Sequence, residues 1–174
     1  MAFKEPDRPM TEKILLTIAV PTFDRAQYLD LCLGQICKQI AGHESVFELL
    51  VSDNHSTDKS PEIVQKYIDQ GYAVRYIRNE VNIGADRNFI QCFERASGKY
   101  VLIFGDDDIL LDGALNKIVE TLRGGEYGVI HVRAYAFSNR RWSVEWCRRK
   151  RERRRGWRER NRRRLLRGDG REEK

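Results

Sequence analysis

Continuous apolar runs alternate along this chain with segments in which apolar residues recur every three or four positions. Short runs rich in β-branched and aromatic residues, bounded by glycine, proline or polar residues, are typical of buried strands. We expect five such strands, at residues 14–20, 47–51, 74–77, 100–104 and about 127–137, and we expect Pro21 to end the first.

The segments between the runs have the apolar period of helices that are buried on one face. Asp24 and Gln27 have the spacing of a capping box, which predicts that Asp24 caps the first helix. A second helix is predicted to start at Ser60-Pro61 and to end at Gly71. The face that we expect the first helix to bury consists of Leu29, Cys32, Leu33, Ile36, Cys37 and Ile40.

Two further helices follow. Residues 85–96 place Phe89, Cys92, Phe93 and Ala96 on one predicted buried side. Asp112 is predicted to cap the last helix, which glycines at 124 and 125 stop. Strands that alternate with helices of about 10–15 residues favour βαβ units. The predicted fold class is therefore α/β, with a mainly parallel sheet flanked by helices.

The length of 174 residues suits one domain with an apolar core. No apolar run approaches the roughly 18 residues of a membrane-spanning helix, and residues 1–12 are too polar for a signal peptide. The cysteines form no CxxC pair and no metal-ligand spacing, so we expect reduced thiols in a cytosolic protein. They are Cys32, Cys37, Cys92 and Cys147.

The charge is distributed very unevenly. Residues 1–139 carry 15 basic and 20 acidic side chains, a net charge of −5. Residues 140–174 carry 17 basic and 6 acidic side chains, a net charge of +11. Three interpretations of this Arg-rich tail compete. It is the product of a frameshift or a mistaken gene end, a basic segment for nucleic acid or anionic lipid, or a solvated charged helix without a task.

Polar loops follow four of the predicted strands. The most acidic is Asp106-Asp107-Asp108, directly after the apolar run 100–104. Adjacent carboxylates repel one another unless a cation neutralises them. Parallel strands end at one edge of a sheet, where α/β proteins bind their ligands. Carboxylate oxygens at such an edge suit Mg²⁺ or Mn²⁺ held together with the phosphates of a substrate. An acidic turn that caps the next helix is the alternative.

Four motifs follow one another along the chain: Ile18-Ala-Val-Pro-Thr-Phe-Asp-Arg25, Val51-Ser-Asp-Asn-His-Ser-Thr-Asp58, Asn82-Ile-Gly-Ala-Asp-Arg-Asn-Phe89 and Ala96-Ser-Gly-Lys-Tyr-Val-Leu-Ile-Phe-Gly-Asp-Asp-Asp108. In this order they resemble the motifs of family 2 glycosyltransferases, especially the abequosyltransferase-like bacterial branch that builds surface polysaccharides. The resemblance covers about residues 14–137. It implies a GT-A fold, a Rossmann-like sandwich that binds a nucleotide-diphosphate sugar.

The resemblance also implies roles for single residues. Thr22 and Phe23 line the base pocket, Asp53 bonds the base or ribose, and Arg87 faces the diphosphate. Asp106 lies near the ribose and, with Asp108, ligates the metal, whereas the role of Asp107 in the nucleotide-sugar site is the least defined. Other interpretations stay open: Arg87 as an ordinary exposed helix residue, Phe23 as core, and Asp53 as a turn former.

We therefore expect three segments: an extension at residues 1–13, a donor-binding GT-A domain at 14–138, and a disordered or non-native tail at 139–174. The expected function is metal-dependent, inverting transfer of a sugar from a UDP-, CDP-, GDP- or dTDP-linked donor to a saccharide or lipid-linked acceptor. The half that shapes the acceptor site and carries the general base is expected to be missing, which puts activity in doubt. We expect a cytoplasmic location, with peripheral association at the inner membrane face left open. The alternative function is nucleic-acid or membrane-surface binding through the tail.

Overall fold

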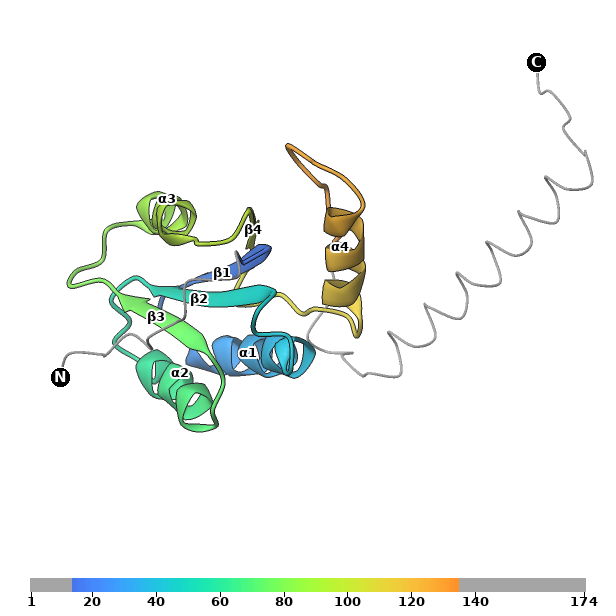
Figure 1. Cartoon of the computed structure of the whole chain (residues 1–174). Helices are drawn as coiled ribbons and strands as arrows, with labels where there is room; N and C mark the ends of the chain where they lie inside the picture. The colour runs from blue at the N-terminus through green and yellow to red at the C-terminus, as the bar shows by residue number, and fades with distance from the viewer. Residues whose placement is uncertain (1–13, 135–174) are drawn as a thin grey trace, which may run out of the picture. The chain divides into compact units, whose positions relative to one another are not determined.

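The computed structural model describes residues 14–134 of the chain. It contains a four-stranded parallel sheet in the order β3-β2-β1-β4, with helices between the strands (Figure 1). This arrangement confirms the predicted α/β class. In chain order the elements are β1 (Leu16–Thr22), α1 (Ala26–Ile40), β2 (Phe47–Asp53), α2 (Ser60–Asp69), β3 (Val74–Arg78), α3 (Ala85–Arg95), β4 (Tyr100–Ile103) and α4 (Ala114–Arg123).

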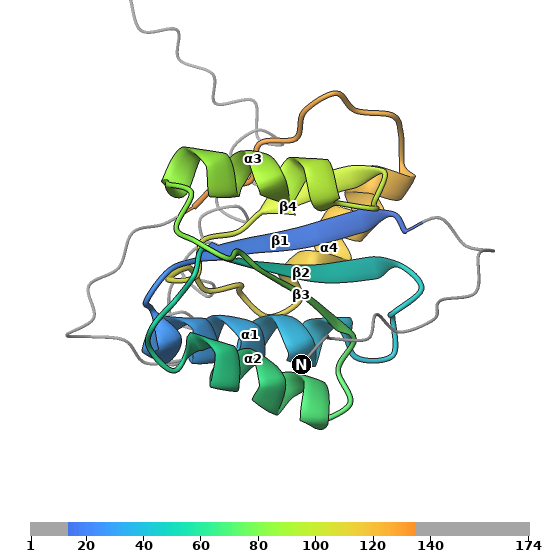
Figure 2. The same ribbon diagram turned by 90° about the vertical axis from the view of Figure 1, so that its left-hand side faces the viewer.

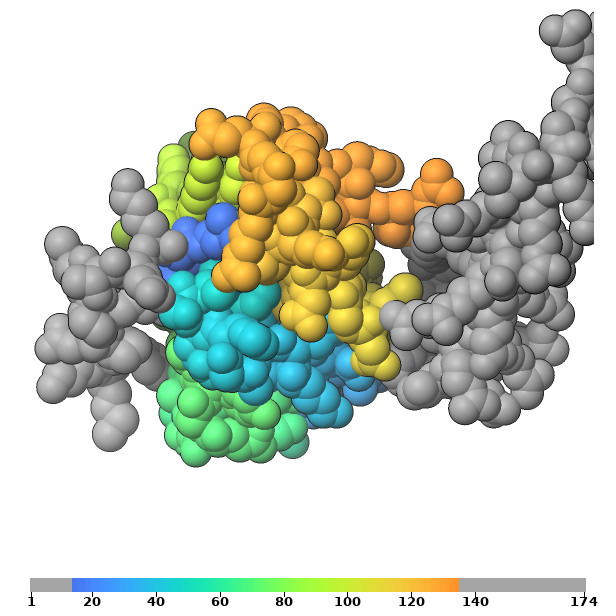
Figure 3. All heavy atoms as spheres, turned by 45° about the vertical axis from the view of Figure 1, so that its right-hand side comes forward, coloured from blue at the N-terminus to red at the C-terminus, as the bar shows by residue number. Residues whose placement is uncertain are grey.

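The helices cover both faces of the sheet. Figure 2 shows α1 and α2 side by side along one face and α3 across the other. The predicted apolar face of α1 is confirmed, since all six of its residues are buried. The helix α4 packs against α1 (Figure 3). The backbone N–H of Leu115 donates to Gln39 Oε1 at 3.4 Å.

The strand order reverses at β1. The chain passes from β1 to β2 and β3 in one direction and then crosses to β4 on the other side of β1. In open α/β sheets the crevice at such a reversal, beyond the carboxyl ends of the strands, is where ligands bind. The residues that follow β1 and β4 are therefore the first place to look for a site.

The sequence predicts that Pro21 ends the first strand, but this prediction is wrong. Pro21 lies within β1, opposite Ser52. Phe104 N donates to Ala19 O, so the peptide groups of Ala19, and two residues on those of Pro21, face β4. The paired register of β4 stops at Ile103, opposite Ala19. Proline has no backbone N–H, but none is needed here because β4 is not paired with β1 at this position. Proline is therefore tolerated.

The buried face of α3 also differs from the prediction. Asn88 and Cys92 are the buried residues of this helix, whereas Phe89 and Phe93 are 46% and 58% exposed. The physical reason lies in β2, where Ser52 Oγ donates to Asn88 Oδ1 at 2.7 Å and Asn88 Nδ2 donates to the Ser52 carbonyl at 2.9 Å. These bonds turn a polar stripe toward the sheet and rotate the phenylalanines away from it.

The predicted fifth strand is wrong over residues 127–134, which have no regular structure; residues 135–137 lie outside the described part. Alternating apolar residues need a neighbouring strand to hold them, and Val129 is 90% exposed. The start of the last helix, α4, also differs from the prediction: its N-cap is Gly113, at φ +73°, and not Asp112. Glycine accepts this left-handed conformation without strain.

Cys32, Cys37 and Cys92 are free and buried, and Cys147 lies outside the described residues. Burial raises the pKa of the Cys37 thiol to about 12 and that of Cys92 to about 11. The thiolate is the reactive form, so these thiols serve as small core residues. Within residues 14–134, the helices are too short or too polar to cross a membrane.

A buried carboxylate joins three segments at the amino-terminal end of the sheet. Glu48 Oε2 accepts hydrogen bonds from Thr17 Oγ1 (2.6 Å) and from the backbone N–H of Ser97 (2.8 Å). Its Oε1 accepts from Ser97 Oγ at 2.9 Å and from Arg75 at 3.2 Å. Burial by itself raises the pKa of Glu48, but these hydrogen bonds outweigh it and the pKa lies below its ordinary value. This carboxylate therefore ties β1, β2 and β3 to the segment that leads into β4.

We expect Glu48→Gln to lower the free energy of unfolding by about 2 kcal/mol, because an amide cannot accept every bond that the carboxylate accepts. A lowered pKa gives stability above the unfolded pKa and loses it as pH falls through the folded pKa. The wild type should therefore lose stability in acid more steeply than the variant. Urea unfolding followed by circular dichroism between pH 3 and 7 measures both effects. The exposed Glu62→Gln on α2 is the control, and equal acid sensitivity of wild type and Glu48→Gln would contradict this role.

Candidate functional site

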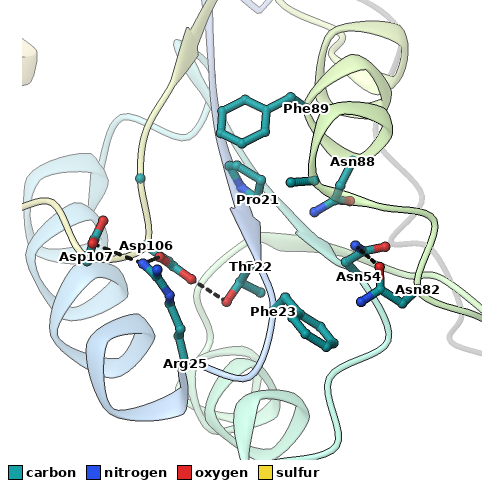
Figure 4. A pocket seen from close by; sticks show the side chains of 12 residues that line it. Pro21, Thr22, Phe23, Arg25, Asn54, Asn82, Asn88, Phe89, Asp106 and Asp107 are labelled. Carbon is teal, nitrogen blue, oxygen red and sulfur yellow. Dashed lines mark hydrogen bonds and ion pairs between the residues drawn. The ribbon is translucent and has the colours of Figure 1, made fainter.

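An open pocket lies at the carboxyl ends of β1 and β4, with a cavity volume of about 400 Å³. Figure 4 shows Thr22, Arg25 and Asp106 converging on one side of it and Asn54, Asn82 and Asn88 gathered on the other. Its twelve lining residues are Pro21, Thr22, Phe23, Arg25, Asn54, Asn82, Ala85, Asn88, Phe89, Gly105, Asp106 and Asp107.

Four of the predicted site residues meet at this pocket: Thr22, Phe23, Asp106 and Asp107. Phe23 is 42% exposed, so the alternative interpretation as a core residue is wrong. An exposed aromatic ring beside a polar pocket offers a face on which a planar group can stack. Phe89 of α3 offers a second such ring, which the sequence pattern assigns to the core.

Asp106 is the best-anchored acidic group of the pocket. Thr22 Oγ1 donates to Asp106 Oδ2 at 2.8 Å, and Arg25 Nη1 donates to Asp106 Oδ1 at 3.2 Å (Figure 4). The same Arg25 nitrogen lies 3.0 Å from Oδ2 of Asp107. Burial raises the pKa of Asp106 above its ordinary value, although Thr22 and Arg25 act in the opposite direction. The carboxylate of Asp106 is thus held at the pocket wall, with Oδ2 bonded to Thr22 and Oδ1 to Arg25.

The loop after β1 is fixed by the loop after β2, and not by the predicted capping box. Asp24 has φ +51° and its Oδ1 accepts hydrogen bonds from the backbone N–H groups of Thr57 (2.6 Å) and Asp58 (3.3 Å). Asp58 Oδ2 in turn accepts from the N–H of Ala26 at 2.8 Å, at the start of α1. A carboxylate of each loop thereby accepts hydrogen bonds from backbone N–H groups of the other loop. The local spacing of residues in the sequence cannot predict these bonds, because the partners are more than thirty residues apart.

Asp53 lies behind the pocket and not in its lining. Its side chain is fully buried, with Oδ1 accepting from the backbone N–H of Ser56 at 2.8 Å and Oδ2 from Tyr76 Oη at 2.6 Å. Arg78 Nε lies 3.6 Å from Oδ2. Both carboxylate oxygens are therefore engaged with the protein itself. These bonds shape the loop that follows β2, and the contact between Asp53 and the base or ribose stays a prediction.

A cluster of side-chain amides forms the opposite wall. Asn54 Nδ2 donates to Asn82 Oδ1 at 2.7 Å, and Asn54 Oδ1 accepts from Asn79 Nδ2 at 3.1 Å and from the N–H of Ile83 at 2.9 Å. Gln91 Nε2 joins the cluster by donating to Asn79 Oδ1 at 2.9 Å. These bonds hold the loop between β3 and α3 against the end of β2. Asn54 lies in the motif at residues 51–58 and Asn82 in the motif at residues 82–89. These asparagines are the sequence signal that indicates this wall.

Arg87 and Asp108 are exposed and do not line the pocket. Arg87 lies in the first turn of α3, between the lining residues Ala85 and Asn88. Arg25 is a lining residue that the sequence reasoning does not single out. Within residues 14–134 there is no group of three His, Cys, Asp or Glu residues that could enclose a metal ion by themselves.

Comparison with protein families gives one match, to the model described as "Glycosyl transferase family 2", over residues 17–170. Among curated proteins, the abequosyltransferase RfbV of Salmonella typhimurium is 36% identical over 103 residues, which are 59% of this chain and 31% of the relative. A GalNAc(5)-diNAcBac-PP-undecaprenol beta-1,3-glucosyltransferase of Campylobacter jejuni is 31% identical over 111 residues, which are 63% of this chain and 35% of the relative. The chain thus spans about a third of the length of these relatives.

Among solved structures, residues 1–349 of TarS from S. aureus in complex with UDP superpose with a TM-score of 0.58 at 26% identity. The match covers 64% of this chain and 32% of TarS 1–349. The similarity agrees with the predicted GT-A fold, and the parallel sheet with flanking helices is the part that the two chains share.

Proposed function

Because the chain belongs to glycosyl transferase family 2, we propose that its pocket binds the nucleotide diphosphate of a sugar donor and serves transfer of that sugar to a hydroxyl group. The observation that supports this most is the position of Asp106, a nearly buried carboxylate held by Thr22 at the reversal of strand order. UDP in the TarS structure is bound by a protein that shares this fold.

In this proposal the base stacks on Phe23, which is exposed beside the pocket, and Thr22 and the asparagine wall frame the nucleoside. Arg87, at the first turn of α3, is within the segment that we expect to face the diphosphate. A charge-assisted bond from a guanidinium suits a phosphate oxygen. Asp53 supports this arrangement from behind by fixing the loop after β2.

A divalent ion fits the acidic side of the pocket in part. Asp106 and Asp107 already hold one cationic group between them, the guanidinium of Arg25, and carboxylate oxygens suit Mg²⁺ or Mn²⁺. Two carboxylates leave most of the coordination sphere to phosphate oxygens and water. When bound, such an ion neutralises the charge that grows on the leaving diphosphate. Asp108, exposed beside them, remains a predicted ligand.

The acceptor is proposed to be a saccharide or lipid-linked saccharide, with inversion by direct displacement. That step requires a general base to deprotonate the attacking hydroxyl. The residues lining the pocket provide carboxylates on the donor side only, so we assign no general base among residues 14–134. The Arg-rich tail lies outside the described residues, and the comparisons do not support the alternative function through it.

Calorimetric titration of UDP, CDP, GDP and dTDP into the full chain, each with and without Mn²⁺, tests the proposal. We expect one or two of them to bind with a micromolar to millimolar Kd and to bind more tightly with Mn²⁺, because an ion held by Asp106 and Asp107 would offset the charge of the diphosphate. Adenosine, which lacks a diphosphate, is the control for stacking alone. Folded protein that binds none of the four nucleotides would contradict the proposal.

A further inference from the structure

One nitrogen atom, Nη1 of Arg25, lies between two carboxylates of the pocket. It is 3.2 Å from Asp106 Oδ1 and 3.0 Å from Asp107 Oδ2. The side chain of Arg25 is 50% exposed and that of Asp107 is 55% exposed, whereas Asp106 is only 8% exposed. A cationic group thus already occupies the position between the oxygens to which an incoming divalent ion would bind.

Arg25 and a divalent ion compete for these oxygens. An ion bound to a carboxylate oxygen requires a distance of about 2.0–2.2 Å, and a second cation 3 Å from that oxygen repels it. The second oxygen of Asp106 already accepts the hydrogen bond from Thr22. An ion therefore binds more tightly when the guanidinium moves away.

The position of Arg25 allows it to move. Its backbone stays fixed as the residue before α1, where its carbonyl accepts from the N–H groups of Tyr28 and Leu29. The long side chain is half exposed, and its side-chain hydrogen bonds within residues 14–134 are those with the two aspartates. Because Arg25 lines the pocket, rotation about its side-chain torsion angles keeps the guanidinium close to a ligand in the cavity.

We propose that Arg25 is a displaceable internal cation that neutralises Asp106 and Asp107 in the free protein and turns to the diphosphate when ion and nucleotide bind together. The inference rests on the proposed function, on its ion for the first half and on its nucleotide for the second. Its consequence is strong coupling: an ion alone must compete with Arg25, whereas an ion that arrives with a diphosphate offers the guanidinium a new anionic partner. Arg25 acts here as a positioning residue for the donor.

Arg25→Gln in the full chain tests both halves, because the two effects have opposite signs. Mn²⁺ alone, titrated by electron paramagnetic resonance, should bind about three- to tenfold more tightly to the variant than to the wild type, as expected for loss of one half-exposed charge pair. UDP titrated at saturating Mn²⁺, or whichever nucleotide the wild type binds, should bind about tenfold more weakly. A purely structural role would not separate the two affinities in this way.

Lys59→Gln is the matched control, since it removes one exposed positive charge from the same edge of the sheet without a contact to the aspartates. Unchanged affinity for Mn²⁺ in Arg25→Gln, or a gain equal to that of Lys59→Gln, would overturn the competition. Arg25→Met, which keeps the apolar stem, replaces the Gln variant if that one does not fold. A wild type that binds no nucleotide would contradict the proposed function, while the Mn²⁺ titration would still decide the competition.

Discussion

Asp106→Asn is expected to weaken binding of the nucleotide diphosphate in the presence of Mn²⁺ by about 100-fold, or about 2.7 kcal/mol. The amide keeps the shape of the carboxylate and can still accept the bond from Thr22, so the fold should be preserved. It loses the charge that attracts the ion, in a position where little water is present to replace it. Calorimetry at a fixed Mn²⁺ concentration measures the loss, and circular dichroism verifies the fold.

Two comparisons make this expectation specific to the site. Asp69→Asn removes one exposed carboxylate from the end of α2, where it accepts a bond from Gln65, and should leave nucleotide affinity unchanged. Asp108→Asn should have a smaller effect than Asp106→Asn, because Asp108 is exposed and does not line the pocket. An effect of Asp108→Asn equal to or larger than that of Asp106→Asn would assign the principal ligand to Asp108 instead.

Asp53→Ala is expected to lower the free energy of unfolding by about 2–4 kcal/mol, because two buried donors lose their charged acceptor. The alanine removes the carboxylate to which the N–H of Ser56 and the hydroxyl of Tyr76 donate. Burial and the bond to Asp53 raise the pKa of Tyr76, so its hydroxyl stays a donor that needs a partner. Urea unfolding at neutral pH measures this loss.

Tyr76→Phe is the companion variant for Asp53. It removes one of the same hydrogen bonds and should cost about 1–2 kcal/mol. In the double variant the two losses should not add, because both remove one shared interaction. If Asp53→Ala kept full stability and lost nucleotide affinity alone, Asp53 would contact the donor directly, as the family resemblance implies.

The fold could be predicted because its signals are local. Five apolar runs and four periodic segments lead to an α/β sheet, and four of the runs are strands in the structure. The convergence of Thr22 and Asp106 also follows from topology, since parallel strands end at a common edge. The fifth run lacks a partner strand among residues 14–134, and sequence alone does not say which run finds a neighbour.

The fine structure of the site depends on contacts between distant residues, which local spacing does not contain. Asp24 has the spacing of a helix cap, but it accepts hydrogen bonds from the backbone N–H groups of Thr57 and Asp58 in another loop. The phenylalanines of α3 have the period of a core, but the buried Asn88 and its bonds to Ser52 rotate the helix the other way. In both cases the contacts of polar groups with residues of another segment outweighed the local sequence pattern.

Pro21 in β1 has a consequence for the shape of the pocket. Two neighbouring parallel strands with free peptide groups tend to extend their pairing, and doing so here would close the crevice between β1 and β4. At Pro21 the ring nitrogen has no hydrogen to donate toward β4, so the ladder cannot continue past Ile103 by regular pairing. The covalent chain itself therefore acts as a spacer that keeps this crevice from closing into sheet.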